Sequence, residues 1–329
     1  MEEKNEAQEK KSNNASVNPS KEGIEYVPGK REKGNSDKIT RDYLDSMLLV
    51  YRHVGAVPPD SGASILGHSF TTPIMSSALA VLEKIRPGGG SIEFAKGMQR
   101  AGALMWTGWI APDDFQAVCE TGVKAVCGIK PFADNDRIFD AIERAAASGA
   151  VACCMDIDHC FDDTGKDCWF MLGDLAHKTE DEITQYAAAA KAAGMPFILK
   201  GILSPEEAVR AKELGVGGVF VSHHKGIWCY AAPPAMMLPE IRTAVGEDYP
   251  VFADCDVHDG VDAFKLLAMG ANGVGVGREL MKAFAINGAG GVYDRLMFMN
   301  DELKGTMAKT HCASIGEINA SSIRMRIGW

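Results

Sequence analysis

A repeated pattern runs through most of the chain: a short apolar segment, a polar or glycine-rich loop, and a longer segment with apolar residues at helical spacing. Segments that are apolar throughout are typical of parallel strands covered on both faces, and the longer segments predict amphipathic helices. The eight apolar segments are 73–77, 103–109, 124–130, 150–158, 197–201, 218–222, 250–254 and 273–277. Eight successive strand–helix pairs predict an α/β fold, a (β/α)8 (TIM) barrel, with a doubly wound open sheet as the alternative.

Residues 196–226 show this pattern most clearly, as a strand, a helix and a second strand. Ser204 at the N-cap, Pro205 in the first turn and Gly215 after the last turn delimit the helix. Lys200 ends the first strand and His224 follows the second. Because α/β folds place their chemistry at the carboxyl ends of parallel strands, both residues are candidates for an active site.

The N-terminal part of the chain departs from this pattern. Residues 1–37 are rich in Lys, Glu, Asn, Ser and Gly, and they predict a flexible tail. Residues 39–55 have apolar side chains at helical spacing and predict a helix that packs on the main body. The predicted organisation is a tail over 1–37 and one barrel domain over 38–329, with an N-terminal helical extension.

Composition narrows the class of protein. A net charge of −10 over 329 residues argues against a general nucleic-acid binder, which would carry a basic patch. No apolar segment is long enough to span a bilayer and no apolar signal core is present, so we expect a cytoplasmic protein without a membrane span. The nine cysteines predict free thiols in a reducing compartment.

Polar side chains and glycines gather at the predicted carboxyl ends of the strands. These candidates for binding and catalysis are Ser76, Ser77, Thr107 to Trp109, Lys130, Asp156, Asp158, Lys200, Ser222 to His224, Asp254, Gly277 and Arg278. The run G-x-G-R at 275–278 predicts a phosphate site, because glycine admits close backbone approach and arginine adds charge where a helix begins. The loop 159–179 is the longest on this face and could cover a substrate.

Several cysteines lie in and after the fourth strand, with one histidine among them. They are Cys153, Cys154, Cys160 and Cys168, with His159. Their spacing matches none of the regular ligand patterns for zinc or iron–sulfur centres, and the first two lie inside a strand. We therefore predict no metal site.

The longest runs with a family likeness are FILKGILSPEEAVRAKELGVGGVFVSHHKG at 197–226 and PVFADCDVHDGVDAFKLLAMGANGVGVGRE at 250–279. Shorter ones are TTPIMSSALA at 71–80, LPEI at 238–241 and DELKGTMAKTHCASIGEI at 301–318. Together they resemble the FMN-dependent 2-hydroxy-acid dehydrogenase and oxidase family, which includes glycolate oxidase and lactate oxidase. The resemblance implies the same barrel, FMN as cofactor, a small-molecule substrate and a homo-oligomer, either a tetramer or an octamer.

The resemblance also implies roles for residues by their position in these runs. It makes His224 the catalytic acid or base, Asp156 the carboxylate that orients it, and Lys200 the cation that stabilises reduced flavin. It assigns the FMN phosphate to Gly277 and Arg278. The other implied flavin contacts are Ser76, Ser77, Ala78, Thr107, Ser222 and Asp254.

The chain departs from the family where relatives hold a substrate carboxylate. Relatives read S-N-H-G-G-R after the sixth strand, and their arginine position is Ile227 here. Lys130 replaces a tyrosine, and the arginine expected after the fourth strand is missing. At the phosphate end relatives read D-G-G-x-R, whereas residues 254–258 here read DCDVH, so that His258 replaces one phosphate arginine.

We therefore expect an FMN-dependent oxidoreductase with an atypical substrate and hydride-equivalent transfer to or from flavin N5. Either Lys130, Lys225 or His223 recruits an anion in a new geometry, or the substrate lacks a carboxylate and meets an apolar pocket. Candidates to line that pocket are Trp106, Trp109, Trp169, Ile227 and Trp228. The alternatives are an FMN-dependent non-redox isomerase, like type 2 isopentenyl-diphosphate isomerases, and a degenerate flavin-binding barrel without catalysis. The electron acceptor and the direction of the reaction stay open.

Overall fold

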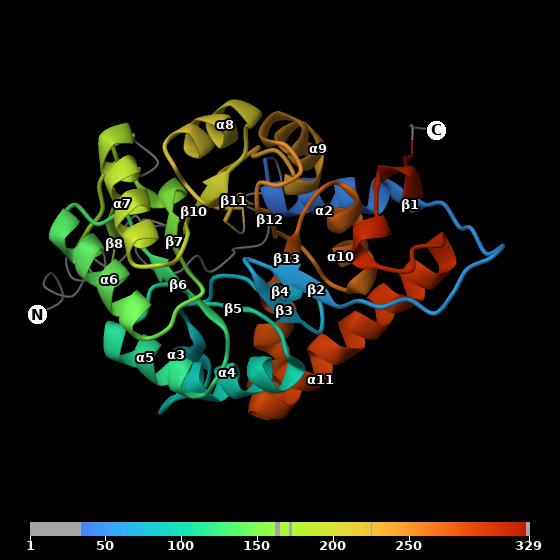
Figure 1. Ribbon diagram of the computed structural model, residues 1–329, viewed down its shortest axis with the longest axis horizontal. Coiled ribbons are helices and arrows are strands. Elements are labelled where there is room, and N and C mark those ends of the chain that lie inside the picture. Colours follow the sequence, from blue (N-terminus) through green and yellow to red (C-terminus); the bar gives the residue numbers. More distant parts are fainter. Residues whose placement is uncertain (1–33, 162–164, 171–172, 225, 327–329) are drawn as a thin grey trace, which may run out of the picture.

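Eight parallel strands form one sheet at the centre of the molecule (Figure 1). The computed structural model describes residues 34–161, 165–170, 173–224 and 226–326. In chain order the strands are β4 (Ile74–Ser76), β5 (Met105–Trp106), β6 (Ala125–Ile129), β7 (Ala152–Asp156), β10 (Phe197–Ile202), β11 (Gly218–Val221), β12 (Val251–Ala253) and β13 (Gly273–Val276). Each is short and almost wholly buried, as expected for strands covered on both faces.

The sheet follows the order β4-β13-β12-β11-β10-β7-β6-β5, so successive strands of the barrel are neighbours. The first and last strands also pair, with Ile74 opposite Val274. At the remaining seam the amide of Ser76 donates to the carbonyl of Leu104 at 3.3 Å. A doubly wound sheet would reverse its order at a middle strand, so that alternative is wrong and the predicted (β/α)8 barrel is confirmed.

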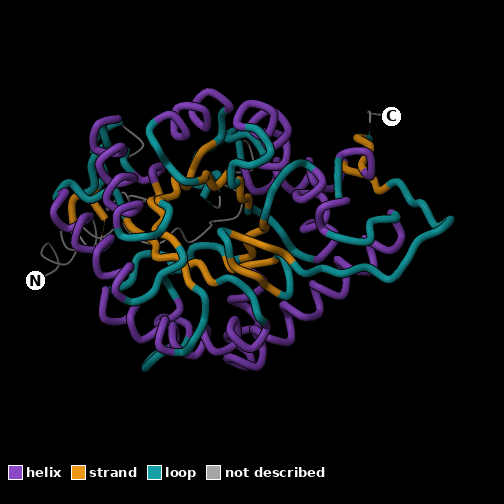
Figure 2. The backbone as a smooth tube through the Cα atoms, viewed as in Figure 1, coloured by secondary structure: helices purple, strands orange, loops and turns teal. Residues whose placement is uncertain are grey.

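Helices surround the barrel (Figure 2). They are α3 (Leu82–Ile85), α4 (Gly90–Ala101), α5 (Pro112–Glu120), α6 (Asn135–Ala147), α7 (Glu180–Ala192), α8 (Pro205–Glu213), α9 (Pro234–Val245), α10 (Gly260–Ala268) and α11 (Arg278–Thr310). The cap of α8 is as predicted, because the Ser204 side chain accepts from the amide of Glu207 and Pro205 is the first helical residue. At α7, Thr179 and Glu182 form a reciprocal capping box.

The N-terminal helix is shorter than predicted. α2 runs over Ser36–Ser46, and the following residues form the strand β1 (Met47–Leu49). β1 pairs antiparallel with β14 (Ile323–Met325). The prediction of one helix over 39–55 is therefore wrong after residue 46, because a partner strand far along the chain captures the apolar run. Most of the predicted tail, residues 1–33, lies outside the described residues.

The core has an inner and an outer layer. Inside the barrel, the Trp106 ring makes edge-to-face contacts with Phe220 and Phe252, at centroid distances of 4.9 and 5.2 Å. Trp106 is completely buried there, so it belongs to the core and not to the predicted pocket. The outer layer, between strands and helices, includes Phe94 and Phe264.

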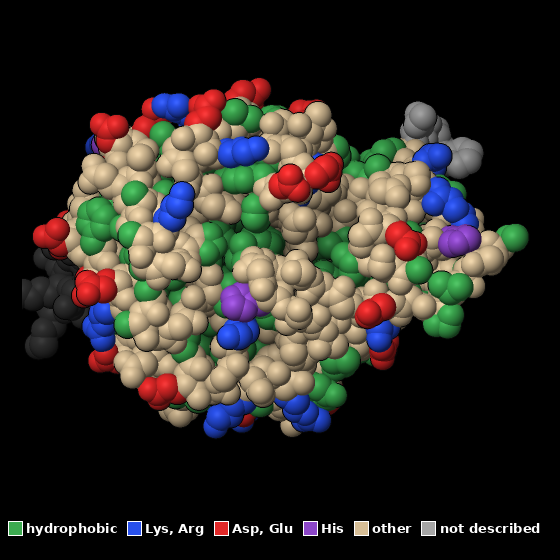
Figure 3. All heavy atoms as spheres, in the orientation of Figure 1, with side chains coloured by type: hydrophobic (Ala, Val, Ile, Leu, Met, Phe, Trp, Pro, Cys, Tyr) green, Lys and Arg blue, Asp and Glu red, His purple; other side chains and the backbone are tan. Residues whose placement is uncertain are grey.

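Small elements complete the fold. The hairpin of β2 (Ala63–Ile65) and β3 (His68–Phe70) packs on the inner core, and β8 (Trp169–Phe170) pairs with β9 (Gly173–Asp174) in the long loop after β7. The described residues also include the 3-10 turns η1 (Ile157–His159), η2 (Ile315–Glu317) and η3 (Ala320–Ser322). Acidic and basic side chains are interspersed on the face shown in Figure 3. Within the described residues, no helix has the length and apolarity that crossing a membrane requires, and none of the nine cysteines forms a disulfide.

Candidate active site

The carboxyl ends of four neighbouring strands bring the predicted catalytic residues together. Lys130 follows β6, Asp156 ends β7, Lys200 lies in β10 opposite Asp156, and His224 follows β11. The Lys130 Nζ donates to Asp156 Oδ2 at 2.6 Å, and the Lys200 Nζ lies 3.5 Å from Asp156 Oδ1. The Lys200 Nζ is also 3.3 Å from His224 Nδ1. Three strand ends therefore place two buried cations around one buried carboxylate, beside the imidazole.

The carboxylate nearest to His224 is Asp158. Its two oxygens lie 3.2 and 3.3 Å from His224 Nδ1, whereas Asp156 Oδ1 is 3.9 Å away. The resemblance implied that Asp156 orients this ring, but in the structure Asp156 mainly holds Lys130 and Lys200. The reason is local: β7 ends at Asp156, and the 3-10 turn η1 directs the next carboxylate toward β11.

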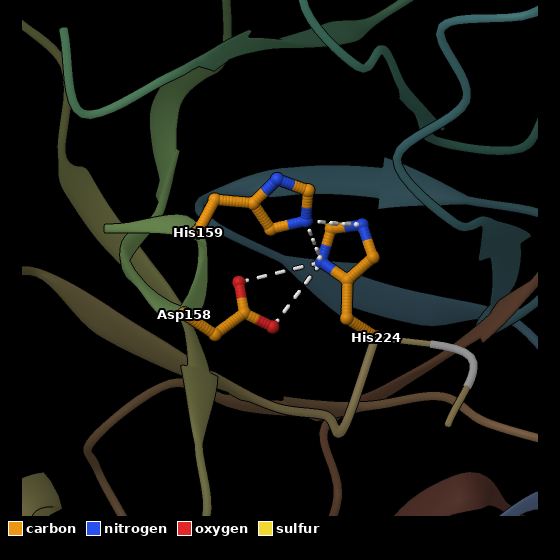
Figure 4. A group of neighbouring side chains, drawn as sticks. All are labelled: Asp158, His159 and His224. Atoms are coloured by element: carbon orange, nitrogen blue, oxygen red, sulfur yellow. Dashed lines mark hydrogen bonds and ion pairs between the residues drawn. The ribbon is translucent and has the colours of Figure 1, made fainter. Parts of the chain in front are cut away.

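A second histidine completes the cluster (Figure 4). The His159 Nε2 lies 3.1 and 3.0 Å from Nδ1 and Nε2 of His224, and its Nδ1 is 3.3 Å from the Lys130 Nζ. An ammonium can only donate, so His159 accepts at Nδ1 and carries its proton at Nε2. The result is a polar path from Lys130 through His159 to His224 and Asp158. Sequence reasoning considered His159 only as a metal ligand; its place three residues after a strand end is the signal that could have found it.

Burial and neighbouring charges set the protonation of this cluster. Burial alone would raise the pKa of Asp158, but His224 and Lys200 outweigh it and lower that pKa to about 2. Burial opposes the charge of Lys200, yet Asp156 foremost raises its pKa above the usual range. Burial is the main reason that the pKa of His159 is well below its usual value. At neutral pH the cluster thus holds a carboxylate and an ammonium beside a neutral imidazole.

The same cluster has the ligand types of a metal site. Asp158, His159 and His224 offer ligand atoms that all lie within 4.8 Å of one another. However, the ammonium groups of Lys130 and Lys200 each lie 3.3 Å from one of the two imidazoles. Two cations in contact with the ligand nitrogens oppose a divalent ion. The absence of a metal stays a prediction.

The start of α11 has the features of a phosphate site. No side chain caps the helix at Gly277, so the first amides need another acceptor, and phosphate oxygens suit them. A Cβ at Gly277 would make ordinary van der Waals contacts with Ser77 and Leu79 at 3.7 Å, so a small side chain would also fit beside this backbone. Arg278 lies at the first position, although its guanidinium contacts the carboxylates of Asp37 and Asp256. The helix start and Arg278 could hold a flavin phosphate at this end, and the two carboxylates already in contact with Arg278 oppose it.

The other predicted flavin contacts lie on the same face, but several use their side chains locally. The Ser76 Oγ accepts from the amide of Trp106, and the Thr107 Oγ1 donates to the carbonyl of Val126. Both hydroxyls hold the barrel wall together. Further contacts of this kind join Ser222 Oγ to the His224 amide and Asp254 Oδ1 to the Cys255 thiol, while Ser77 and Ala78 are half-buried beyond β4.

The residues predicted to line the substrate pocket lie in different surroundings. Trp109 is mostly buried and packs edge-to-face on Phe132 at 4.8 Å, so it belongs largely to the core. Ile227 is half-buried, and Trp228 lines a cavity of about 530 Å³. The other residues that line this cavity are Ile157, Asp158, Cys160, Phe161, Gly165, Gly201 and Glu207. Among these described residues the charged ones are both acidic. Lys225 and the Trp169 side chain lie outside the described part of the chain.

The predicted anion-recruiting groups already have partners. Lys130 is paired with Asp156, as above. His223 is completely buried; its Nδ1 accepts from the amide of Gly226 at 2.9 Å, and its Nε2 lies 2.7 Å from the Thr40 Oγ1. His223 therefore anchors α2 and does not face the cavity with a free donor.

Comparison with known proteins agrees with this architecture. The family model described as FMN-dependent dehydrogenase matches residues 15–167 and 173–325. L-lactate oxidase of Alicycliphilus denitrificans is 42% identical over 130 residues, which is 39% of this chain and 36% of that protein. Glycolate oxidase 3 of Arabidopsis thaliana is 28% identical over 306 residues, which covers 80% of this chain and 81% of the relative.

Solved structures agree as well. A lactate oxidase of Pediococcus acidilactici superposes with a TM-score of 0.82 over 92% of this chain and 90% of the other, at 23% identity, which shows the shared fold. A mandelate oxidase variant with 2-hydroxy-phenylacetamide gives a TM-score of 0.79 at 25% identity, over 91% and 92% of the two chains. The predicted enzyme class, an FMN-dependent oxidoreductase, is confirmed at the level of the family. The chain belongs to the FMN-dependent dehydrogenase family, and FMN is its cofactor.

Proposed function

We propose that the protein transfers hydride equivalents between FMN and the carbinol carbon of a small alcohol that carries no carboxylate, with His224 exchanging the hydroxyl proton. FMN, when bound, supplies the acceptor or donor of the two electrons. The observation that carries the proposal is the contact of His224 Nδ1 with Asp158, at 3.2 Å, beside the buried Lys200.

The hydrogen bonds around His224 support a role as acid or base. With its proton on Nδ1, His224 donates to Asp158, and the Lys200 Nζ at 3.3 Å from that nitrogen then makes no hydrogen bond to it. This tautomer leaves the lone pair of Nε2 for a substrate hydroxyl. His159 approaches that same nitrogen at 3.0 Å and donates to it, so a substrate hydroxyl would take the place of this donor. When His224 takes up a proton, the ionised Asp158 stabilises the imidazolium. The two carboxylates thus have different partners: Asp158 contacts His224, and Asp156 contacts Lys130 and Lys200.

Lys200 supplies a fixed positive charge. Lys200 is 3% exposed, and its ammonium remains protonated because Asp156 and Asp254 raise its pKa. In this family the matching lysine lies near flavin N1 and O2. A cation there stabilises the negative charge that develops when the flavin is reduced, and burial strengthens the effect.

The charges around the cavity support a substrate without a carboxylate. Ile227 cannot pair with an anion, and a guanidinium clamp is a bidentate device that other side chains rarely replace. Among the described residues that line the cavity, Asp158 and Glu207 are the charged ones. An anionic substrate would meet these two acids, while Lys130 is already paired with Asp156. Neutral or cationic alcohols avoid that repulsion.

Three matched compounds test this proposal. Lactate, lactamide and 1-amino-2-propanol share a methyl carbinol and differ in the neighbouring group, which is anionic, neutral and cationic. The holoenzyme is mixed anaerobically with each, and the loss of oxidised flavin absorbance is followed. We expect lactamide or 1-amino-2-propanol to reduce the flavin at least about tenfold faster than lactate. Lactate as the fastest reductant would contradict the substrate proposal.

Two variants test the role of His224 as a base and the effect of the missing arginine at position 227 separately. His224→Asn should slow flavin reduction by roughly 10²–10⁴-fold, because the proton acceptor is lost. The matched control is His53→Asn, since that residue is exposed and its ring contacts Tyr51 at a centroid distance of 5.8 Å. Ile227→Arg should raise the rate with lactate specifically. Full activity of His224→Asn would instead favour a reaction that needs no base here, and a parent whose flavin none of the three compounds reduces would favour the barrel without catalysis. The homo-oligomer and the cytoplasmic location stay predictions.

A further inference from the structure

The basic side chains at the phosphate end already contact carboxylates. The Arg278 Nη1 donates to Asp37 Oδ2 at 2.8 Å, and its Nη2 donates to Asp256 Oδ1 at 2.6 Å. The same Asp256 oxygen lies 2.9 Å from His258 Nε2. Arg278 and His258 are the two groups that would hold the phosphate if FMN binds as in the family. Both therefore contact an acid of this chain, and we call these four residues the acid-filled phosphate end.

The backbone holds Asp256 in place at some cost. Cys255 and Asp256 have φ values of 78° and 57°, in the left-handed region that favours glycine. Relatives have two glycines at these positions, so this chain keeps the turn but adds side chains to it. The Arg41 Nη1 donates to the Asp256 carbonyl at 3.0 Å, and the Asp256 carboxylate is 6% exposed. A strained conformation persists only when its surroundings fix it, and here they fix a buried carboxylate.

The second carboxylate comes from the N-terminal helix. Asp37 lies in the first turn of α2, and its Oδ1 is buried without a hydrogen bond from any described residue. Thr40 contacts the buried His223, and Arg41 makes a bidentate ion pair with Asp262 at 2.7 and 2.9 Å. These contacts fix α2 over the start of α11. An acid with one unsatisfied oxygen is thus held where a phosphate dianion would approach.

The charges of the two acids exceed that of the arginine. One guanidinium faces two carboxylates, so a phosphate must displace one of them or accept repulsion. The uncapped amides of α11 still attract an anion, but a flavin gains little net energy from its phosphate. We propose that Asp37 and Asp256 cancel most of the phosphate's contribution, so that the site takes riboflavin, which has no phosphate, nearly as well as FMN. This inference rests on the family's placement of the flavin.

A competition experiment measures the selectivity directly. The purified holoenzyme is dialysed to equilibrium against equal concentrations of FMN and riboflavin, and the flavins released on denaturation are quantified. We expect the ratio of bound FMN to bound riboflavin to stay within about tenfold of one. Asp256→Asn should raise this ratio by at least about tenfold, and Asp37→Asn should raise it in the same direction.

Controls make each result decisive. Asp42→Asn lies on the same helix, but its side chain is 63% exposed and pairs with Lys38, so the ratio should not change. Retained riboflavin in each variant shows that the fold and the ring site are intact. A parent protein that prefers FMN by about a thousandfold would overturn the proposal, as would variants with an unchanged ratio. A parent that keeps neither flavin would overturn the flavin placement itself.

Discussion

Replacing Asp158 by asparagine removes a buried charge with little change in shape. The carboxylate lies within 3.3 Å of His224 Nδ1, and its side chain is 7% exposed. Asparagine keeps the size and one oxygen but loses the attraction to His224 and Lys200. Those two neighbours outweigh the effect of burial and lower the pKa of Asp158. The folded state therefore stabilises the ionised form, and the variant should be less stable at neutral pH.

The pKa gives the magnitude. A lowering from 3.8 to about 2 corresponds to about 2 kcal/mol of folding free energy, since each pKa unit is worth about 1.4 kcal/mol. A group whose folded pKa is depressed stabilises the protein above its unfolded pKa and loses that effect as the pH falls through the folded pKa. The difference between parent and Asp158→Asn should thus be full from pH 5 upward. It should shrink below about pH 4 and approach zero near pH 2.

Urea unfolding of parent and variant at several pH values tests this reasoning. Asp113→Asn serves as the control, because that carboxylate is 87% exposed and its ion pair with Arg144 should contribute less than about 1 kcal/mol. A stability difference that is absent at pH 7 would show that His224 and Lys200 do not stabilise the Asp158 charge. A difference of the same size at pH 7 and pH 2.5 would show that packing, and not ionisation, causes it.

Two further changes test the packing around the site. The amide of Gly226 donates to Nδ1 of His223, so Nε2 carries the proton that the Thr40 hydroxyl accepts. Thr40→Val should leave this buried N–H unpaired and lower the free energy of unfolding in urea by about 1–3 kcal/mol. An unchanged urea midpoint would refute that hydrogen bond. In α11, a Cβ at Gly291 would lie 2.1 Å from the carbonyl of Ala283, whereas at Gly305 it meets open space. In thermal unfolding, Gly291→Ala should therefore lower the melting temperature strongly. Gly305→Ala should keep or raise it, because alanine stabilises a helix by up to about 1 kcal/mol relative to glycine.

Strand ends could be predicted from the sequence because an apolar run that stops at a polar residue marks them. Lys200 and His224 follow this rule, and both lie at the centre of the cluster. Which carboxylate meets His224 could not be predicted in the same way. Asp156 and Asp158 are two residues apart, and the 3-10 turn between them decides which one reaches β11. The turn has no distinct sequence signal, so the likeness to relatives pointed to Asp156 alone.

The misplaced helix boundary has a different cause. The run after Ser46 has apolar residues that suit either a helix or a strand. It becomes β1 because β14, almost at the other end of the chain, offers its backbone as a partner. No window along the sequence contains both strands. Likewise, the contacts of Arg278 with Asp37 and Asp256 join three distant segments, and only the fold brings their charges together.

The pairing of β1 with β14 joins segments near the two ends of the described chain. β1 continues directly from α2, and α2 is the helix that contributes Asp37 over the start of α11. A cut or fusion that frees β14 would leave β1 without its partner, and α2 would then depend on its remaining contacts, such as Thr40 with His223 and Arg41 with Asp262. The C-terminal strand thus supports the helix that carries Asp37, although the two lie far apart in the sequence. We therefore expect a truncation before β14 to loosen the contact of Asp37 with Arg278.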